Sequence, residues 1–308
     1  MPAWLVRVDA ALQHTLRLRD EPFIGRLALG TSYVGRRPLP FAETADPYAL
    51  VDVSVGVGWR TLELSLASGI QQMLLPKEAP AIPGLDLDAR YAPAQKVGGD
   101  LYDVFPLGAT RLGVVVADVS GKGIPASLLM AICRTNLRQI APRHESPAAA
   151  LSELNRALGE DMRGMFITMI YAVIDTAAQS VTFARAGHEL PLFSRRHAVT
   201  GVPEESYAGS EGMPLGMVPD EIFSAVIADQ RERFGPGDVL VLYTDSITEA
   251  PNEEDKEFSG PRLADTVRTL HSRSARELND GILEQVHRFA GATAQRDDLT
   301  LVTVKRTA

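Results

Sequence analysis

The chain has 308 residues, of which 45% are hydrophobic and 23% charged, and its formal net charge is −8. This balance is typical of a globular protein and argues against a disordered or fibrous one. The negative charge argues against a nucleic-acid-binding or anionic-membrane-binding surface. The longest stretch without a charged residue, residues 64–76, is too short to cross a bilayer. The single cysteine, Cys133, excludes internal disulfides and CxxC motifs, and without a secretory signal we expect a cytoplasmic protein.

The chain divides into three stretches of different composition. Residues 1–60 are interpreted as a short N-terminal regulatory segment of uncertain fold, in which alternating valines over residues 51–59 predict a half-buried strand. Residues 61–80 are interpreted as a linker helix followed by a proline-rich break. Helical spacing predicts the helix over 61–75, although its start also fits a strand. Residues 81–308 are long enough for one compact domain.

Apolar runs and amphipathic patterns predict the elements of this domain. Strands are predicted at residues 112–117, 167–174, 181–184, 191–193, 225–228, 238–243 and 299–304. Helices are predicted at 125–140, 147–162, 261–271 and 275–290. The last of these begins with a capping box, Ser274 with Glu277. Because strands group with strands and helices with helices, we expect an α+β layered sandwich rather than a parallel βαβ fold.

Several aspartates lie at the end of an apolar strand or beside one. They are Asp100, Asp118, Asp245 and the pair Asp297 and Asp298. A carboxylate next to a buried strand must be compensated, and hard oxygen ligands select Mg²⁺, Mn²⁺ or Ca²⁺ rather than zinc. A strand-end turn, in which the side chain bonds the backbone, explains any one of them alone. It does not explain all of them together with their neighbouring glycines.

Five motifs in chain order resemble a known family. They are Tyr91-x-Pro-Ala-x-x-Val-Gly-Gly-Asp-x-Tyr-Asp, Asp118-Val-Ser-Gly-Lys-Gly-Ile-Pro-Ala, Ala186-Gly-His-x-x-Pro, Tyr243-Thr-Asp-Ser-Ile-Thr-Glu-Ala and Arg296-Asp-Asp-Leu-Thr, preceded by Ile70-Gln-Gln-x-Leu-Leu-Pro. Over residues 62–306 the chain resembles the SpoIIE/RsbU-type serine/threonine phosphatases of the PPM (type 2C) superfamily. Five co-linear motifs are far more specific than one short pattern.

The resemblance implies an αββα sandwich, in which two antiparallel β-sheets are flanked by helices, with two Mn²⁺ or Mg²⁺ ions at one edge. The metal ligands that it implies are Asp100, Asp118, the Val119 carbonyl, Asp245 and Asp297. Asp118, Asp245 and Asp297 are expected to carry catalysis, which is the hydrolysis of phosphoserine or phosphothreonine by a metal-activated water. No cysteine or serine nucleophile is needed.

Supporting roles are expected for residues around these ligands. Asp298 is expected to stabilise its turn, Gly99 to let the backbone approach the metals, and Asp103 either to support the ligands or to be exposed. Lys122 and Lys96 are candidate phosphate contacts, although surface lysines are usually just solvated.

Two positions depart from relatives, and one histidine is discounted. Ser246 stands where the family usually has glycine. Ser120 stands where eukaryotic relatives carry a candidate general-acid histidine, so the proton donor is unassigned. His188 is interpreted as a turn-stabilising residue rather than a ligand.

The resemblance also implies a substrate and a mode of regulation. The implied substrate is a phosphorylated STAS-domain anti-anti-sigma factor in a partner-switching pathway. The implied control is an upstream activator acting on the N-terminal segment, and a homodimer through helix 61–75 is a further hypothesis. Two alternatives remain open: a catalytically weak or inactive phosphatase-fold regulator that binds a partner, and a small-molecule phosphohydrolase.

Overall fold

A computed structural model gives the backbone of residues 5–18, 21–34, 37–38, 44–45, 48–59, 76, 80, 82–94, 97–162 and 164–307. The predicted helix over 61–75 and Lys96 lie outside the described residues. The chain forms two compact units, residues 1–67 and 68–308.

The first unit contains an antiparallel sheet in the order β1-β2-β5. Its strands are β1 (Leu5–Leu18), β2 (Glu21–Val34) and β5 (Tyr48–Trp59), and the short strands β3 (Arg37–Pro38) and β4 (Thr44–Ala45) pair with each other. The strand predicted from the alternating valines over residues 51–59 lies within β5. Alternation indicates a strand because successive residues of a strand point to opposite faces of the sheet.

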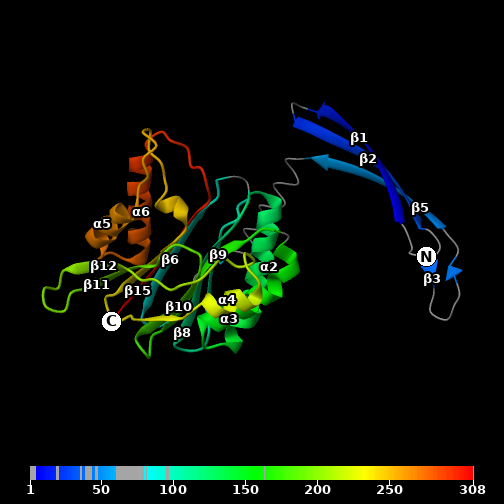
Figure 1. Cartoon of the computed structure of the whole chain (residues 1–308). Coiled ribbons are helices and arrows are strands. Elements are labelled where there is room, and N and C mark those ends of the chain that lie inside the picture. Colours follow the sequence, from blue (N-terminus) through cyan, green and yellow to red (C-terminus); the bar gives the residue numbers. More distant parts are fainter. Residues whose placement is uncertain are drawn as a thin grey trace. The chain divides into compact units, whose positions relative to one another are not determined.

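The second unit is built on two five-stranded antiparallel sheets (Figure 1). One has the order β13 (Gln230–Arg233), β10 (Ser180–Ala186), β9 (Ile167–Asp175), β8 (Arg111–Val119), β7 (Leu101–Pro106). The other has the order β12 (Pro203–Tyr207), β11 (Leu192–Arg196), β14 (Val239–Tyr243), β15 (Leu299–Arg306), β6 (Leu85–Ala92). The facing sides of the two sheets bury one apolar core, which includes Val114, Phe183 and Val302.

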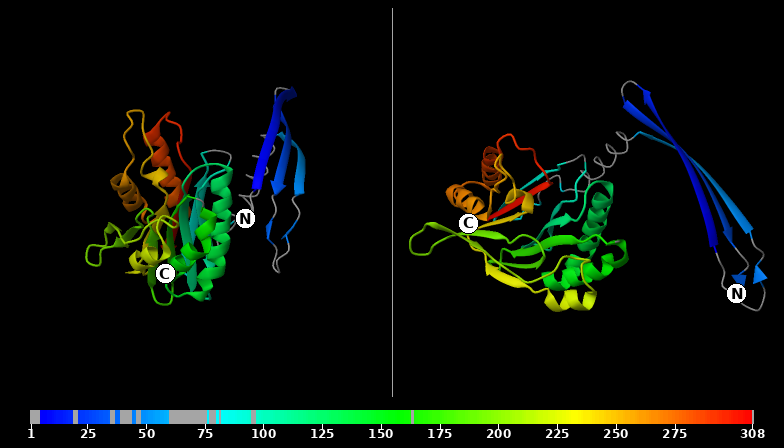
Figure 2. Two further views of the ribbon diagram at one scale, coloured as in Figure 1. Left: turned by 45° about the vertical axis from the view of Figure 1, so that its right-hand side comes forward. Right: turned by 45° about the horizontal axis from the view of Figure 1, so that its top comes forward.

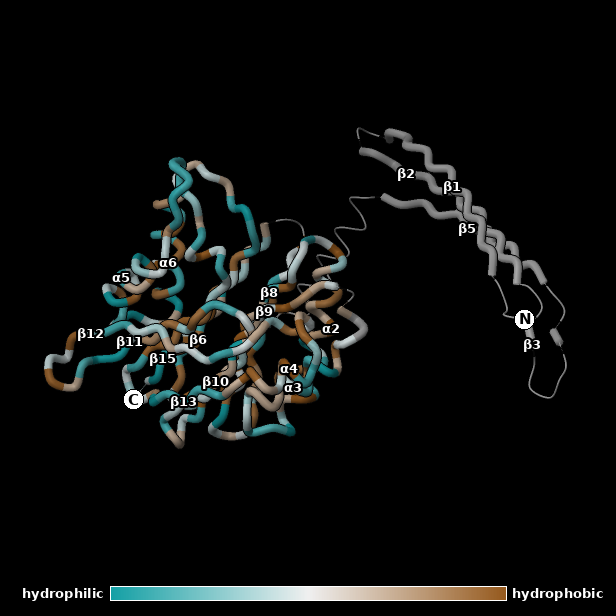
Figure 3. Tube along the Cα trace, in the orientation of Figure 1, coloured by the Kyte–Doolittle hydropathy of each residue, from teal (hydrophilic) through white to brown (hydrophobic). Residues whose placement is uncertain are grey.

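Helices cover the outer face of each sheet (Figure 2). The helices are α2 (Ile124–Ile140), α3 (Pro147–Leu158), α4 (Asp220–Val226), α5 (Gly260–Leu270) and α6 (Ala275–Ala290), with the 3₁₀ turns η1 (Ala141–Arg143), η2 (Gly159–Met162) and η3 (Asp245–Ile247). A second core lies between α2, α3 and β8–β10, and a third between α5, α6 and β14–β15. Hydrophobic segments gather around β8, β9 and α2 (Figure 3). The predicted αββα sandwich is therefore confirmed.

Local sequence explains where these helices begin. The Ser146 side chain accepts a hydrogen bond from the Ala149 amide and caps α3, with Pro147 in the first turn. The predicted capping box of Ser274 and Glu277 is present at the start of α6.

The structure corrects the prediction at several places. The strand predicted at 225–228 is wrong, because this apolar stretch begins as the last turn of α4, which has acidic residues in its first turn. Strands β6 and β7 were not predicted, since β6 is half-buried along its length and shows no clean alternation. The helix predicted to end at 162 stops at Leu158 and continues as a 3₁₀ turn.

Candidate functional site

Asp118 lies at the end of the central strand β8, next to its last residue, Val119. The run of buried apolar residues before it fixes β8 inside the sandwich and carries the carboxylate to the sheet edge. Burial, followed by the nearby charges of Asp245, Asp297 and Asp298, raises the pKa of Asp118 to about 7, against the lowering effect of a hydrogen bond with Asp100. Carboxylates far apart in the sequence therefore act on one another here.

Asp100 is the most buried of these carboxylates, with 2% of its surface exposed. Two hydroxyl groups from the other sheet donate to its Oδ2 atom, Thr244 Oγ1 at 2.9 Å and Thr300 Oγ1 at 2.6 Å. Burial, followed by the charge of Asp118, nevertheless holds the pKa of Asp100 well above its ordinary value. Asp100 thus joins both sheets at the site and carries a charge that the protein alone does not balance.

Asp245 and Asp297 form the open side of the site. Asp245 begins η3 after strand β14, and Asp297 precedes β15. Burial and the charge of Asp297 raise the pKa of Asp245. The Asp297 side chain is 52% exposed and forms an ion pair with Lys122 Nζ at 3.0 Å. The same Nζ atom donates a hydrogen bond to the Arg296 carbonyl at 2.9 Å. Lys122 therefore ties the loop after β8 to the loop before β15.

Asp298 and Gly99 hold the loop that leads into Asp100. The Asp298 carboxylate accepts from the Ala94 amide at 2.8 Å and from the Gly99 amide at 2.7 Å. A Cβ atom at Gly99 would lie 2.8 Å from the Val119 carbonyl oxygen, closer than side chains are found. Glycine is required there because the loop passes directly over that carbonyl.

Asp103 lies elsewhere, on β7 against α2. Its carboxylate is 1% exposed and forms ion pairs with Arg134 at 3.1 Å and Arg138 at 2.6 Å. The interpretation of Asp103 as an exposed residue is wrong, because two guanidinium groups balance a buried charge. Its contacts are to α2 and not to the carboxylates at the strand ends.

Ser120 and His188 also take part in local hydrogen bonds. The Ser120 amide donates to the Phe166 carbonyl at 2.9 Å, and the Phe166 amide donates to Ser120 Oγ at 2.8 Å. His188 Nδ1 lies 3.0 Å from Thr168 Oγ1, and burial lowers the pKa of His188 to about 3, so its imidazole is neutral at pH 7. Both residues fix strands and turns behind the carboxylates.

Sequence reasoning missed three residues of the site. Thr244 and Thr300 lie inside the quoted motifs. A hydroxyl side chain beside a strand end could have indicated a hydrogen-bond donor to a carboxylate. Glu189 occupies a variable place in its motif and gave no signal. Burial and then the charge of Asp245 raise the pKa of Glu189, which places it beside the open side.

The donor set fits divalent cations of the hard class. Every candidate ligand offers oxygen, and the like charges that raise the pKa values of Asp118 and Asp245 would be relieved by a bound cation. The close approach of Gly99 to the Val119 carbonyl also leaves that oxygen unshielded by a side chain. Within the described residues, no three His, Cys, Asp or Glu side chains stand ready to hold one ion.

Known proteins resemble this chain in sequence and in fold. The model of the Stage II sporulation protein E (SpoIIE) family matches residues 108–307. The phosphoserine phosphatase RsbU of Bacillus subtilis is 29% identical over 245 residues, which cover 79% of this chain and 70% of RsbU. Protein IcfG of Synechocystis is 27% identical over 285 residues, which cover 83% of this chain and 43% of IcfG.

A solved structure shows the same fold. The crystal structure of the RsbU and RsbW domains of a Mycobacterium tuberculosis protein matches with a TM-score of 0.66 and 27% identity, covering 76% of this chain and 63% of that one. The chain spans less than half the length of IcfG. No helix in the described part of the chain is both long enough and apolar enough to span a membrane.

Proposed function

The chain belongs to the SpoIIE family, and from this premise we propose that it is a metal-dependent protein phosphatase acting on phosphoserine or phosphothreonine. The observation that carries the proposal is the meeting of carboxylates from four separate motifs. The charges of Asp245 and Asp297 both act on the half-buried Asp118, which in turn acts on Asp100. Uncompensated carboxylates at one sheet edge are costly for folding and are retained where they serve a site.

Two Mg²⁺ or Mn²⁺ ions would be held by Asp100, Asp118, the Val119 carbonyl, Asp245 and Asp297. When bound, they would supply the Lewis acidity that polarises a phosphoryl group and activates water for in-line attack. The number and identity of the ions are part of the proposal.

The chain's own residues organise this site in three ways. The hydroxyls of Thr244 and Thr300 orient the Asp100 carboxylate through hydrogen bonds of 2.9 and 2.6 Å. Asp298 fixes the loop before Asp100 through two backbone amides. Lys122 holds the Asp297 carboxylate and carries a positive charge at the open side, where a substrate phosphate would approach. These contacts supply positioning before substrate binds, which is the larger part of catalysis in phosphoryl transfer.

A phosphorylated STAS-domain anti-anti-sigma protein is the substrate class that we propose. The name of RsbU, a phosphoserine phosphatase, and the crystal structure that contains RsbU and RsbW domains support a partner-switching role. We also propose that residues 81–308 form the phosphatase domain and residues 1–60 a regulatory segment. The separate compact unit at residues 1–67 supports this division.

The test is incubation of the full chain with a phosphorylated STAS protein and with p-nitrophenyl phosphate. We expect release of phosphate that depends on Mn²⁺ or Mg²⁺ and stops with a chelator. Intact mass of the STAS protein should fall by one phosphate group. Binding of the phosphoprotein without turnover of either substrate, at any concentration of these ions, would contradict the proposal and favour a partner-binding regulator.

A further inference from the structure

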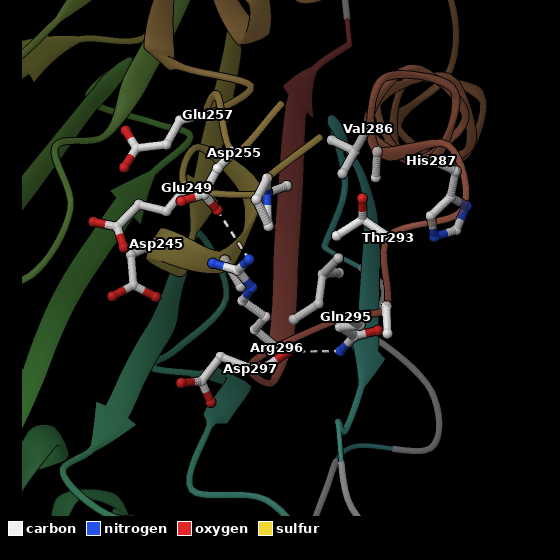
Figure 4. Close-up of a pocket in the computed structure, with 16 residues that line it drawn as sticks. Asp245, Glu249, Asp255, Glu257, Val286, His287, Thr293, Gln295, Arg296 and Asp297 are labelled. Carbon is white, nitrogen blue, oxygen red and sulfur yellow. Dashed lines mark hydrogen bonds and ion pairs between the residues drawn. The ribbon is translucent and has the colours of Figure 1, made fainter. Parts of the chain in front are cut away.

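A pocket of about 310 Å³ opens directly beside the open side of the carboxylate site. Asp245 and Asp297 line one end of it, so a group bound in the pocket lies next to the proposed reaction centre (Figure 4). The remaining walls come from the segment after η3, from α6 and from the loop before β15. The mechanism proposed above uses none of these walls.

The charge of the pocket is strongly negative. Five carboxylates and one guanidinium line it. The guanidinium, Arg296, is already paired with Asp255 at 2.9 Å (Figure 4). Among the described residues neither Glu249 nor Glu257 has a side-chain hydrogen bond or ion pair, and both line the pocket. Two carboxylates are therefore left for a cationic partner even when Asp245 and Asp297 are engaged.

The opposite wall of the pocket includes an apolar strip. The strip is formed by Val286 and Ala290 on α6 and by Leu299 at the start of β15, and His287, Thr293 and Gln295 also line the pocket. A hydrated metal ion gains no favourable contact from apolar side chains. The aliphatic part of a lysine or arginine side chain, by contrast, packs on apolar surface while its charged group lies among carboxylates. The combination of an apolar strip and an acidic rim fits a basic side chain.

We propose that this pocket binds a lysine or arginine side chain of the phosphoprotein substrate, close in sequence to its phosphorylated residue. The inference rests on the proposed phosphatase function and names a determinant of its specificity. Because the pocket ends at Asp245 and Asp297, and an extended chain advances about 3.3 Å per residue, the basic residue lies within about three positions of the phosphorylated one. Glu249 and Glu257 are the specificity-determining residues.

The test compares phosphoserine peptides that differ at one position only. Each of the three positions on either side of phosphoserine is occupied in turn by lysine or by acetyl-lysine, which keeps the stem and removes the charge. With the full chain and Mn²⁺, we expect a kcat/KM ratio of lysine to acetyl-lysine of roughly threefold to tenfold at one or more positions. The ratio should shrink as ionic strength rises, because the rim is solvent-exposed.

Variants assign the preference to the pocket. The double change Glu249→Gln with Glu257→Gln should bring the ratio close to one. The matched control is Glu254→Gln, which removes the same charge from the same segment but from a side chain that is paired with Lys256 at 2.7 Å and does not line the pocket. That variant should keep the wild-type ratio.

The outcomes separate the two proposals. If p-nitrophenyl phosphate and all phosphopeptides resist hydrolysis, the phosphatase function itself fails. If the peptides are hydrolysed but lysine and acetyl-lysine behave alike at all six positions, or if the double variant keeps the preference, the phosphatase function stands and the cationic pocket is overturned.

Discussion

Strand β15 buries two threonines that have different roles. Thr300 and Thr303 are both fully buried, and each donates its hydroxyl proton in a hydrogen bond of 2.6 Å. Thr300 donates to the Asp100 carboxylate at the candidate catalytic end. Thr303 donates to the Asn279 side-chain oxygen in the second half of the strand, residues 303–306, where α6 packs on the sheet; this half is called the structural end below.

The surroundings of these two bonds differ in charge balance. At the Thr303 end, the Asn279 amide group donates to the Asp88 carbonyl and carboxylate, so donors and acceptors match. At the Thr300 end, the pKa of Asp100 stays well above its ordinary value despite two donated hydrogen bonds, because burial and Asp118 oppose its charge. Buried polar groups whose donors and acceptors are all paired stabilise a fold. Buried carboxylates whose charge is not compensated indicate a site that binds a ligand.

The largest effect that this comparison predicts is that of Asp118→Asn. Loss of a carboxylate that would hold the proposed cations should lower kcat on p-nitrophenyl phosphate by about a thousandfold or more, since metal-based charge stabilisation is worth several kcal/mol. The folded protein should not lose stability, because the change removes a half-buried charge that its like-charged neighbours oppose. Asp88→Asn, on β6 opposite Thr303, is the control and should keep its activity. Activity in Asp118→Asn within tenfold of wild type would remove the basis of the comparison.

Replacing each threonine by valine tests the two ends directly. Thr303→Val should lower the free energy of unfolding by about 1–3 kcal/mol, because a buried amide oxygen loses its donor, and should leave kcat unchanged. Thr300→Val should lower kcat about tenfold through a misplaced Asp100, with a smaller loss of stability. Urea unfolding and steady-state kinetics measure both effects. Equal patterns in the two variants would show that the ends of β15 do not differ in role.

The structural end also predicts a dependence of stability on pH. His271 is 2% exposed, its Nδ1 atom lies 2.8 Å from Ser194 Oγ, and burial followed by the charges of Arg196 and Lys305 lowers its pKa to about 4. The unfolded chain binds a proton near pH 6.5 and the folded chain does not, so this stability is present above pH 6.5 and is lost between pH 6.5 and about 4.

The measurement is urea unfolding of wild type and His271→Gln at pH 7 and pH 5. The wild-type protein should lose about 1–2 kcal/mol more than the variant over this interval. His188 and other groups titrate in both proteins, so the difference isolates His271. Identical losses in the two proteins would mean that His271 gains a proton without cost in the folded state.

The sequence predicted the candidate catalytic end better than it predicted long-range ion pairs such as those of Asp103, for a physical reason. Motifs with glycine and aspartate at strand ends are local, so Asp118 and Asp245 could be found by reading along the chain. The ion-pair partners of Asp103 are Arg134 and Arg138 on α2, which lie 31 and 35 residues away in the sequence. No local sequence pattern predicts ion pairs over such a separation. Asp103 was therefore expected either to support the ligands or to be exposed, and the ion pairs that bury it were not predicted.

Strands at the sheet edges could also not be predicted from the local sequence pattern. In β6 every residue but the last is half-buried, so the period-two signal is absent. The apolar stretch at 225–228 contains the end of α4, where packing of the buried Phe223 decides in favour of a helix. Tertiary contacts, rather than local preference, determine both outcomes.

The smallest predicted effect comes from the lysines near the two ends of β15. Lys122 and Lys305 each bridge two chain segments, Lys122 through Asp297 and the Arg296 carbonyl, and Lys305 through the carbonyls of His271 and Arg273. Because Lys122 is 47% exposed, solvent screens its pair. Lys122→Gln should raise the KM for a phosphoprotein about twofold to fivefold with unchanged stability. Lys305→Gln should lower stability by less than about 1 kcal/mol and leave KM unchanged. If Lys122→Gln alters stability and not KM, this lysine belongs with the structural contacts.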